Sequence, residues 1–325
     1  MTRPSVIIDC DPGVDDGVAL LLAFAATDAL DILAVTTVAG NVGAELTARN
    51  ACIIREIAGR EDVPVHTGCE RPLQREPIEA GHFHGESGLG SLPLREPRVG
   101  ANSRQAVDFL IATLEKAGER SISLVATGPL TNLATALTQQ PTIRRAISEI
   151  ALMGGARSEG GNITASAEYN IYADPHAAQL IFTLDVPIVA FGLDATHQVR
   201  ATTERIARLR QIVTPEAAAA TELLRFATHL PANGPPEVGS PVHDPCPIAW
   251  LLQPELFEFR PCCIDVETDS RLTLGHTAVE FREMVGRPQN VRWAVKADAA
   301  GIFALLERQL DRQSQHRLPP KAAVR

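Results

Sequence analysis

The 325-residue sequence lacks any apolar run of the roughly 18–20 residues that a membrane-spanning helix needs. It also lacks clusters of Lys and Arg, and its formal net charge of -9 argues against a surface that binds nucleic acid or another polyanion. The first residues enter an apolar, strand-like run without the hydrophobic segment and cleavage site of a signal peptide. We therefore expect a cytoplasmic protein with no membrane and no nucleic-acid partner.

The six cysteines lack the C-x₂-C spacing that is typical of zinc sites. The adjacent pair Cys262 and Cys263 lies in a strand-like run, where reduced thiols are more natural than a disulfide. We predict that the cysteines are small buried apolar residues in a reducing compartment.

The chain also lacks internal repeats, low-complexity tracts and a clear linker, which favours one domain over residues 1–312. The polar residues 313–325 are expected to form a frayed tail.

Short β-branched runs alternate with helical patterns over the first three-quarters of the chain. Strands that are apolar throughout and separated by helices predict a parallel sheet covered on both faces. The fold class is therefore α/β, with an open, mostly parallel, doubly wound sheet and a small antiparallel C-terminal addition. The predicted strands are 6–8, 32–38, 63–66, 122–126, 150–153 and 188–191, then 262–267, 277–282 and 291–296. The predicted helices are 17–26, 44–58, 104–117, 130–137, 175–184, 216–229, 245–252 and 299–310.

An aspartate-rich loop follows the first predicted strand and holds four carboxylates within eight residues: Asp9, Asp11, Asp15 and Asp16. A Pro-Gly turn brings Asp15 and Asp16 back beside Asp11. Carboxylates this close repel one another, and a helix N-terminus offsets only about 0.3–1 kcal/mol per charge. A divalent cation would compensate them more fully, and an all-oxygen set without a Cys/His cluster favours Ca²⁺ or Mg²⁺. Helix capping by one or two of these acids is the alternative interpretation.

Two distant positions are candidates to complete a six- to eight-coordinate site. The backbone carbonyl of Thr127 ends a buried strand, where it has no further ladder partner. Asp244 follows His243 at the start of a predicted helix, where it could instead serve only as an N-cap. In open α/β sheets ligands bind beyond the carboxyl ends of strands, and Asn41 and Asp194 are further polar residues at such ends.

Seven short blocks keep their order over about residues 5–250. They are DCDPGVDD from Asp9, TVAGN from Thr37, HGESGLG from His84, ATGPLTN from Ala126, MGG from Met153, EYNIYADP from Glu168 and HDP from His243. This ordered set resembles the inosine-uridine-preferring nucleoside hydrolases, which cleave ribonucleosides into free base and ribose. The set as a whole is highly specific, whereas the first block alone is only moderately so.

The resemblance implies a role for each matching position. Ca²⁺ would be held by Asp11, Asp16, the Thr127 carbonyl and Asp244, together with the attacking water and two ribose hydroxyls. The residues implied to bind or surround the ribose and orient the water are Asp15, Asn41, Met153, Asn162, Glu168 and Asn170. The family also implies a homodimer or homotetramer.

The chemistry of the reaction gives independent reasons for these residue types. Breaking an N-glycosidic bond develops positive charge on the ribose, which surrounding carboxylates stabilise. Ca²⁺ lowers the pKa of its bound water, and Asp11 can accept the proton as general base. The leaving base benefits from protonation, for which His243 is our candidate acid and His84 a possible partner. A surface or structural role is the alternative for both histidines.

Three positions leave the substrate open. Tyr169 stands where many relatives have Phe, and we expect its hydroxyl near the sugar. Phe226 and His229, near the end of a predicted helix, are weak candidates for a base pocket, since an aromatic residue at helical spacing is more often part of the core. Purine or pyrimidine preference is not readable from these residues.

Two rival classes remain at this point. A haloacid-dehalogenase-like phosphatase also uses Asp-x-Asp with Mg²⁺ after a strand, but Gly13 stands where it would want Thr or Val. A non-catalytic, Ca²⁺-dependent sugar-binding protein would have no need for a water-orienting Asn41 or for His243 beside the metal.

Overall fold

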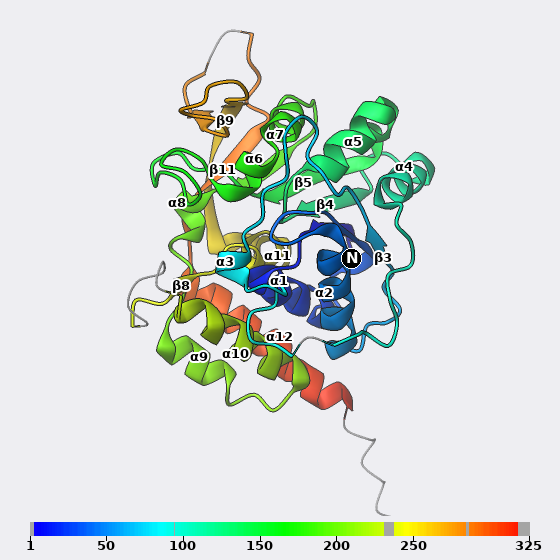
Figure 1. Ribbon diagram of the computed structural model, residues 1–325, viewed down its shortest axis with the longest axis vertical. Coiled ribbons are helices and arrows are strands. Elements are labelled where there is room, and N and C mark those ends of the chain that lie inside the picture. Colours follow the sequence, from blue (N-terminus) through cyan, green and yellow to red (C-terminus); the bar gives the residue numbers. More distant parts are fainter. Residues whose placement is uncertain (1–2, 94, 231–236, 284–285, 318–325) are drawn as a thin grey trace, which may run out of the picture.

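A nine-stranded sheet forms the centre of the computed structural model, which describes residues 3–93, 95–230, 237–283 and 286–317 (Figure 1). Its strands are β1 Ser5–Cys10, β2 Asp31–Thr37, β3 Val65–Thr67, β4 Ile122–Ala126, β5 Ile147–Met153, β6 Ile188–Phe191, β9 Phe257–Val266, β10 Thr277–Glu280 and β11 Val291–Ala297. They lie in the order β10-β9-β11-β6-β5-β4-β1-β2-β3.

The pairing confirms the predicted fold class. β1 is parallel to both β2 and β4, and β5, β6 and β11 continue the parallel sheet. β9 is antiparallel to both β11 and β10, so the predicted antiparallel strands extend the same sheet. From β1 the chain runs outward to β3 on one side and then returns to β4 on the other. The strand order therefore reverses between β1 and β4, which is where an α/β sheet opens a crevice for ligands.

Side chains of β1 enter two separate cores because successive residues of a strand point to opposite faces. Val6 and Ile8 join the core on one face, and Ile7 joins the core on the other. The first face is covered by α1 Val14–Ala25, α2 Ala44–Ile57, α9 Thr203–Leu209, α10 Pro215–Thr228, α11 Pro245–Leu252 and α12 Ala299–Arg317. The second is covered by α4 Ala106–Lys116, α5 Thr131–Gln139 and α7 Pro175–Phe182.

Several short elements were not predicted. They are α3 Gly81–His84, α6 Tyr169–Ala173, α8 Leu193–Thr196, α9, two 3₁₀ turns (Pro141–Ala146 and Pro254–Leu256) and a two-stranded ribbon of β7 Arg200–Ala201 and β8 Ser240–Pro241.

The last helix is longer than predicted. It continues past Leu310 to Arg317, so the first part of the expected tail is helical, and residues 318–325 lie outside the described residues. Within the described ranges, every helix is too short or too polar to span a bilayer.

Candidate active site

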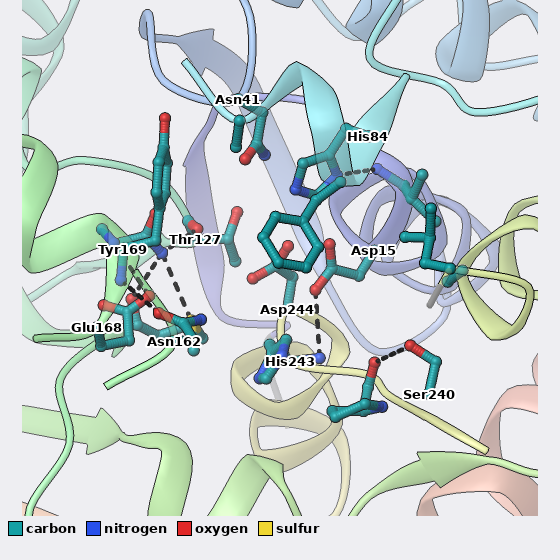
Figure 2. A pocket seen from close by; sticks show the side chains of 18 of the residues that line it. Asp15, Asn41, His84, Thr127, Asn162, Glu168, Tyr169, Ser240, His243 and Asp244 are labelled. Carbon is teal, nitrogen blue, oxygen red and sulfur yellow. Dashed lines mark hydrogen bonds between the residues drawn. The ribbon is translucent and has the colours of Figure 1, made fainter. Parts of the chain in front are cut away.

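A cavity of about 390 Å³ lies beyond the carboxyl ends of β1, β4 and β5, where the strand order reverses. Figure 2 shows Asp15 and Asp244 at its centre, between Asn41 and His243. The predicted metal ligands, the predicted ribose-binding residues, His84 and His243 all line it except Asp11 and Asp16, which are fully buried beside it. The lining residues among them are Asp15, Asn41, His84, Thr127, Met153, Asn162, Glu168, Asn170, His243 and Asp244.

The Asp11 carboxylate is closely packed at the end of β1. Its Oδ2 accepts a hydrogen bond from the Asn41 backbone N–H at 2.8 Å, whereas its buried Oδ1 has no partner among the described residues. A Cβ atom added to Gly40 would lie 2.1 Å from Oδ2, and one added to Gly128 would lie 2.5 Å from Oδ1. Burial, followed by the charge of Asp16, raises the pKa of Asp11 well above its usual value. This buried acceptor therefore needs a cation or a proton.

Asp16 is held by three donors from three segments. The Gly13 backbone N–H donates to its Oδ2 at 3.0 Å, within the capping box that starts α1. The Asn41 amide donates to the same oxygen at 3.1 Å, and the Thr127 hydroxyl donates to Oδ1 at 2.7 Å. Burial is nevertheless the dominant cause and raises the pKa of Asp16 to about 7.

Three carboxylates converge at this point. Oxygen atoms of Asp15, Asp16 and Asp244 all lie within 4.8 Å of one another. Burial, followed by the charge of Asp15, raises the pKa of Asp244 well above its usual value. Asp244 makes no side-chain cap to α11, so the capping interpretation is wrong for this residue. An all-oxygen cluster in which the pKa values of Asp16 and Asp244 are raised, beside the unpartnered acceptor of Asp11, could hold a metal ion.

One wall of the cavity is an interlocked carboxylate–amide network. The Glu168 carboxylate accepts from the backbone N–H groups of Gly155, Asn170 and Ile171, at 2.9–3.2 Å, and so caps α6. Burial outweighs these bonds and raises the pKa of Glu168 to about 7. The Asn170 amide donates to the Thr127 carbonyl at 2.7 Å and to the Met153 carbonyl at 3.2 Å. The Thr127 carbonyl, predicted to lack a ladder partner, accepts from this side chain instead, and its second lone pair remains.

The Tyr169 hydroxyl, which we expected near the sugar, is bonded to two backbone carbonyls. It donates to the carbonyls of Gly40, at 2.7 Å, and Ile78, at 3.1 Å, and the residue also lines the cavity. The side chain thereby joins the start of α6 to the loop that carries Asn41 and to the segment before α3.

The two predicted histidines lie on different elements. The Nδ1 atom of His84, at the end of α3, accepts from the backbone N–H of Val14 at 3.0 Å. The Nδ1 atom of His243 lies 2.8 Å from the Thr196 hydroxyl, and its backbone N–H donates to Asp15 at 3.3 Å. Burial lowers the pKa of His84, and it lowers the pKa of His243 to about 4. His243 is therefore neutral at pH 7 in the metal-free chain.

The rest of the cavity lining was not predicted. It consists of Val14, Ala80, Phe83, Ile163, His197, Arg200, Leu224, Ala227, Leu230, Ser240 and Pro241. Leu224 and Ala227 come from α10, but the weak candidates chosen on that helix, Phe226 and His229, do not line the cavity. Phe226 instead packs against Gly85 and Gly90, and His229 is exposed. Helical spacing identifies an apolar face but cannot say which part of it meets a ligand.

Two other acids have local structural roles. Asp194 accepts from the backbone N–H groups of Arg157 and Ser158, both at 2.8 Å, and does not line the cavity. Asp9 lies behind Asp11 and accepts from the Thr36 hydroxyl and, at 2.8 Å, from the Asn132 amide.

Comparison with known proteins extends over nearly the whole chain. The sequence model of the family described as inosine-uridine preferring nucleoside hydrolase matches residues 6–304. A pyrimidine-specific ribonucleoside hydrolase, RihA, of Shewanella woodyi is 42% identical over 318 residues, which cover 97% of this chain and 100% of the relative. An uncharacterized protein of Schizosaccharomyces pombe is 40% identical over 307 residues, covering 94% and 99%.

Solved structures agree with this assignment. A plant nucleoside hydrolase, PpNRh1, superposes with a TM-score of 0.84 at 32% identity and covers 95% of this chain and 99% of its own. A purine-preferring ribonucleoside hydrolase from Gardnerella vaginalis superposes with a TM-score of 0.86 at 28% identity, covering 94% and 99%. This chain belongs to the inosine-uridine preferring nucleoside hydrolase family.

Proposed function

We propose that the protein hydrolyses the N-glycosidic bond of ribonucleosides to free base and ribose. The observation that carries the proposal is one cavity in which a cluster of buried carboxylates faces the Glu168–Asn170 network. Such a cavity suits a polyhydroxylated ring that becomes positively charged, because both walls offer fixed acceptors and the carboxylates oppose the new charge.

We propose Ca²⁺ as the resident cation, held by Asp11, Asp16, the Thr127 carbonyl and Asp244. The fit rests on the unpartnered Oδ1 of Asp11, the crowded carboxylates and a donor set made only of oxygen. When bound, the ion would lower the pKa of a water molecule and hold it for attack.

The chain's own residues have separable roles in the proposal. Asp11 accepts the proton of the attacking water, and Asn41 orients that water while holding Asp11 and Asp16 through its backbone and side-chain amides. The ribose is gripped or enclosed by Asp15, Met153, Asn162, Glu168 and Asn170.

The leaving base is assigned to the histidine side of the cavity. When the Thr196 hydroxyl donates to Nδ1 of His243, the neutral imidazole carries its proton on Nε2, where it can be shared with the departing base through a hydrogen bond. His84 supports this step from α3. His243→Ala should slow nucleosides strongly and p-nitrophenyl riboside little, because nitrophenolate leaves without a proton. Equal loss on both substrates would contradict the acid role.

Release of ribose from inosine, uridine, cytidine and adenosine tests the proposal directly. We expect release from at least one nucleoside, loss of activity on chelation or in Asp11→Ala, and recovery of the chelated wild type with Ca²⁺. The control variant, Asp28→Ala, lies on the exposed surface and should behave as wild type. p-Nitrophenyl phosphate should remain uncleaved. A flat reducing-sugar signal with all the nucleosides would contradict the proposal.

Four wider features of the protein are also proposed. The protein works in the cytoplasm, in purine or pyrimidine salvage, as a homodimer or homotetramer. Residues 1–312 fold as one domain, which is supported by the sheet that joins β1 to β9, β10 and β11. Light scattering at several concentrations measures the mass of the assembly, and a constant monomer mass would contradict the oligomer.

A further inference from the structure

The wall of the cavity that faces away from the Glu168 network carries a fixed positive charge. Arg200 lies in β7 and pairs with Pro241 of β8, and both residues line the cavity together with Ser240. Figure 2 shows Ser240 on the side opposite Asn162, Glu168 and Tyr169, with His243 between them. A ribose held at the Glu168 side therefore directs its base toward the ribbon that carries Arg200.

The Arg200 guanidinium is anchored without a counterion among the described residues. Its Nε donates to the carbonyls of Gly239, at 3.1 Å, and Val238, at 3.3 Å, and a terminal nitrogen donates to the His197 carbonyl at 3.4 Å. The residue is half-buried, and none of the ion pairs within the described ranges involves it. Carbonyl contacts fix the orientation of the group but leave its full charge in place.

We infer that Arg200 stabilises the negative charge of the departing base and favours bases with carbonyl oxygens, uracil and hypoxanthine, over the amino-substituted bases cytosine and adenine. This inference rests on the proposed function. Cleavage breaks the bond between C1′ and the base nitrogen, and the electron pair leaves with the base. The water oxygen bonds to C1′, and the proton that the water loses is balanced by the proton that the base gains.

The chemistry of the leaving base explains the preference. In the uracil and hypoxanthine anions the negative charge spreads onto carbonyl oxygens, which accept hydrogen bonds from a guanidinium. Cytosine and adenine carry an amino group in place of one such oxygen, and guanidinium offers donors only, so two donors would face each other. Discrimination of this kind is strong where a site is built around a particular polar group.

The experiment compares Arg200→Met with wild type on uridine, cytidine, inosine, adenosine and p-nitrophenyl riboside. We expect kcat/KM for uridine and inosine to fall about 10- to 100-fold, and kcat/KM for the amino-substituted nucleosides and the nitrophenyl riboside to fall far less. The wild-type preference for uridine over cytidine should therefore collapse in the variant. Arg200→Lys, which keeps the charge, should recover part of the preference.

The matched control is Arg208→Met. Arg208 lies on α9, the helix that follows β7 of the ribbon. It is exposed, forms ion pairs with Glu204 and Glu307 and does not line the cavity. It should leave all five substrates unchanged. If Arg200→Met lowered kcat/KM equally on every substrate, Arg200 would have only a structural role and the inference would be overturned. An unchanged ratio of kcat/KM for uridine to that for cytidine would also overturn it. Absence of any nucleoside cleavage by wild type would instead overturn the proposed function.

Discussion

At the scale of single residues, the position of the Asp11 carboxylate depends on the absence of side chains at two neighbouring glycines. Gly40 and Gly128 flank the carboxylate so closely that a methyl group on either would overlap one of its oxygens. Interiors as densely packed as this cannot absorb such an overlap without moving the carboxylate or the backbone. The two glycines therefore determine the position of the acid that we propose as general base.

Gly128→Ala should cost the enzyme at least about 100-fold in kcat/KM, because displacement of a reacting group by about 1 Å has effects of that size. The matched control is Gly118→Ala, whose new Cβ would meet nothing closer than 3.9 Å. Nucleoside hydrolysis and the rise in unfolding temperature on adding Ca²⁺ are the two measurements. Wild-type activity in Gly128→Ala would show that Asp11 has more room than its neighbours indicate.

The identities of most site residues could be predicted, whereas their contacts could not. Asp11, Asn41 and Asp244 stand in recognisable blocks at strand or helix ends, where an α/β sheet gathers its ligands. Arg200 stands in no such block, and its place in the cavity follows from a ribbon pairing between residues about 40 positions apart. The Tyr169 hydroxyl is similar, since its partners Gly40 and Ile78 are far away in sequence.

At the scale of elements, long periodic segments were predicted well and short ones were missed. α2 and α10 bury residues that recur three or four positions apart, as the helical period requires. α6 has only five residues, too few to be stable alone, and it forms because the Glu168 carboxylate caps its N-terminus and its residues pack into the fold. Such an element depends on tertiary contacts that periodicity does not record.

Thr214→Ala should lower the free energy of unfolding by about 1 kcal/mol. Thr214 is the N-cap of α10, because its hydroxyl oxygen accepts from the Ala217 backbone N–H at 3.1 Å. Denaturant unfolding is the measurement, and Thr214→Ser, which retains the oxygen, is the matched control. KM should change little, because the cavity-lining residues Leu224 and Ala227 lie two turns or more from the cap. Equal stability of Thr214→Ala and Thr214→Ser would contradict the capping role.

At the scale of the whole molecule, folding gathers carboxyl groups that hold their protons more tightly than in the unfolded chain. Burial raises the pKa of Asp16 from 3.8 to about 7 and that of Glu168 from 4.5 to about 7. These two groups stabilise the folded state fully when the pH is below their unfolded pKa values. The stabilisation is lost as the pH rises toward 7, because the unfolded state binds fewer protons than the folded state between these pKa values. The metal-free fold therefore becomes less stable over this range.

In the presence of chelator, the contribution of these groups should lower the unfolding temperature between about pH 5 and pH 8. Excess Ca²⁺ should raise it again, and by more at the higher pH, because the ion binds the deprotonated carboxylates. Scanning fluorimetry with and without Ca²⁺ at each pH isolates the site from the other titrating groups. Asp11→Ala, the control, should respond much less to the ion. A Ca²⁺ effect that is constant across this range would contradict the coupling.

The two walls of the cavity are supported by backbone elements of different stability. Asp11, Asp15 and Asp16 follow β1, which is hydrogen-bonded to β2 on one side and to β4 on the other within the nine-stranded sheet. Arg200 and Ser240 stand on a ribbon of only two residue pairs. Backbone amides of β1 should exchange with solvent only when the whole protein unfolds, while those of the ribbon exchange through local opening. Substitutions on the ribbon should therefore alter the choice of base at little cost to the stability of the fold, whereas substitutions at the end of β1 should cost more.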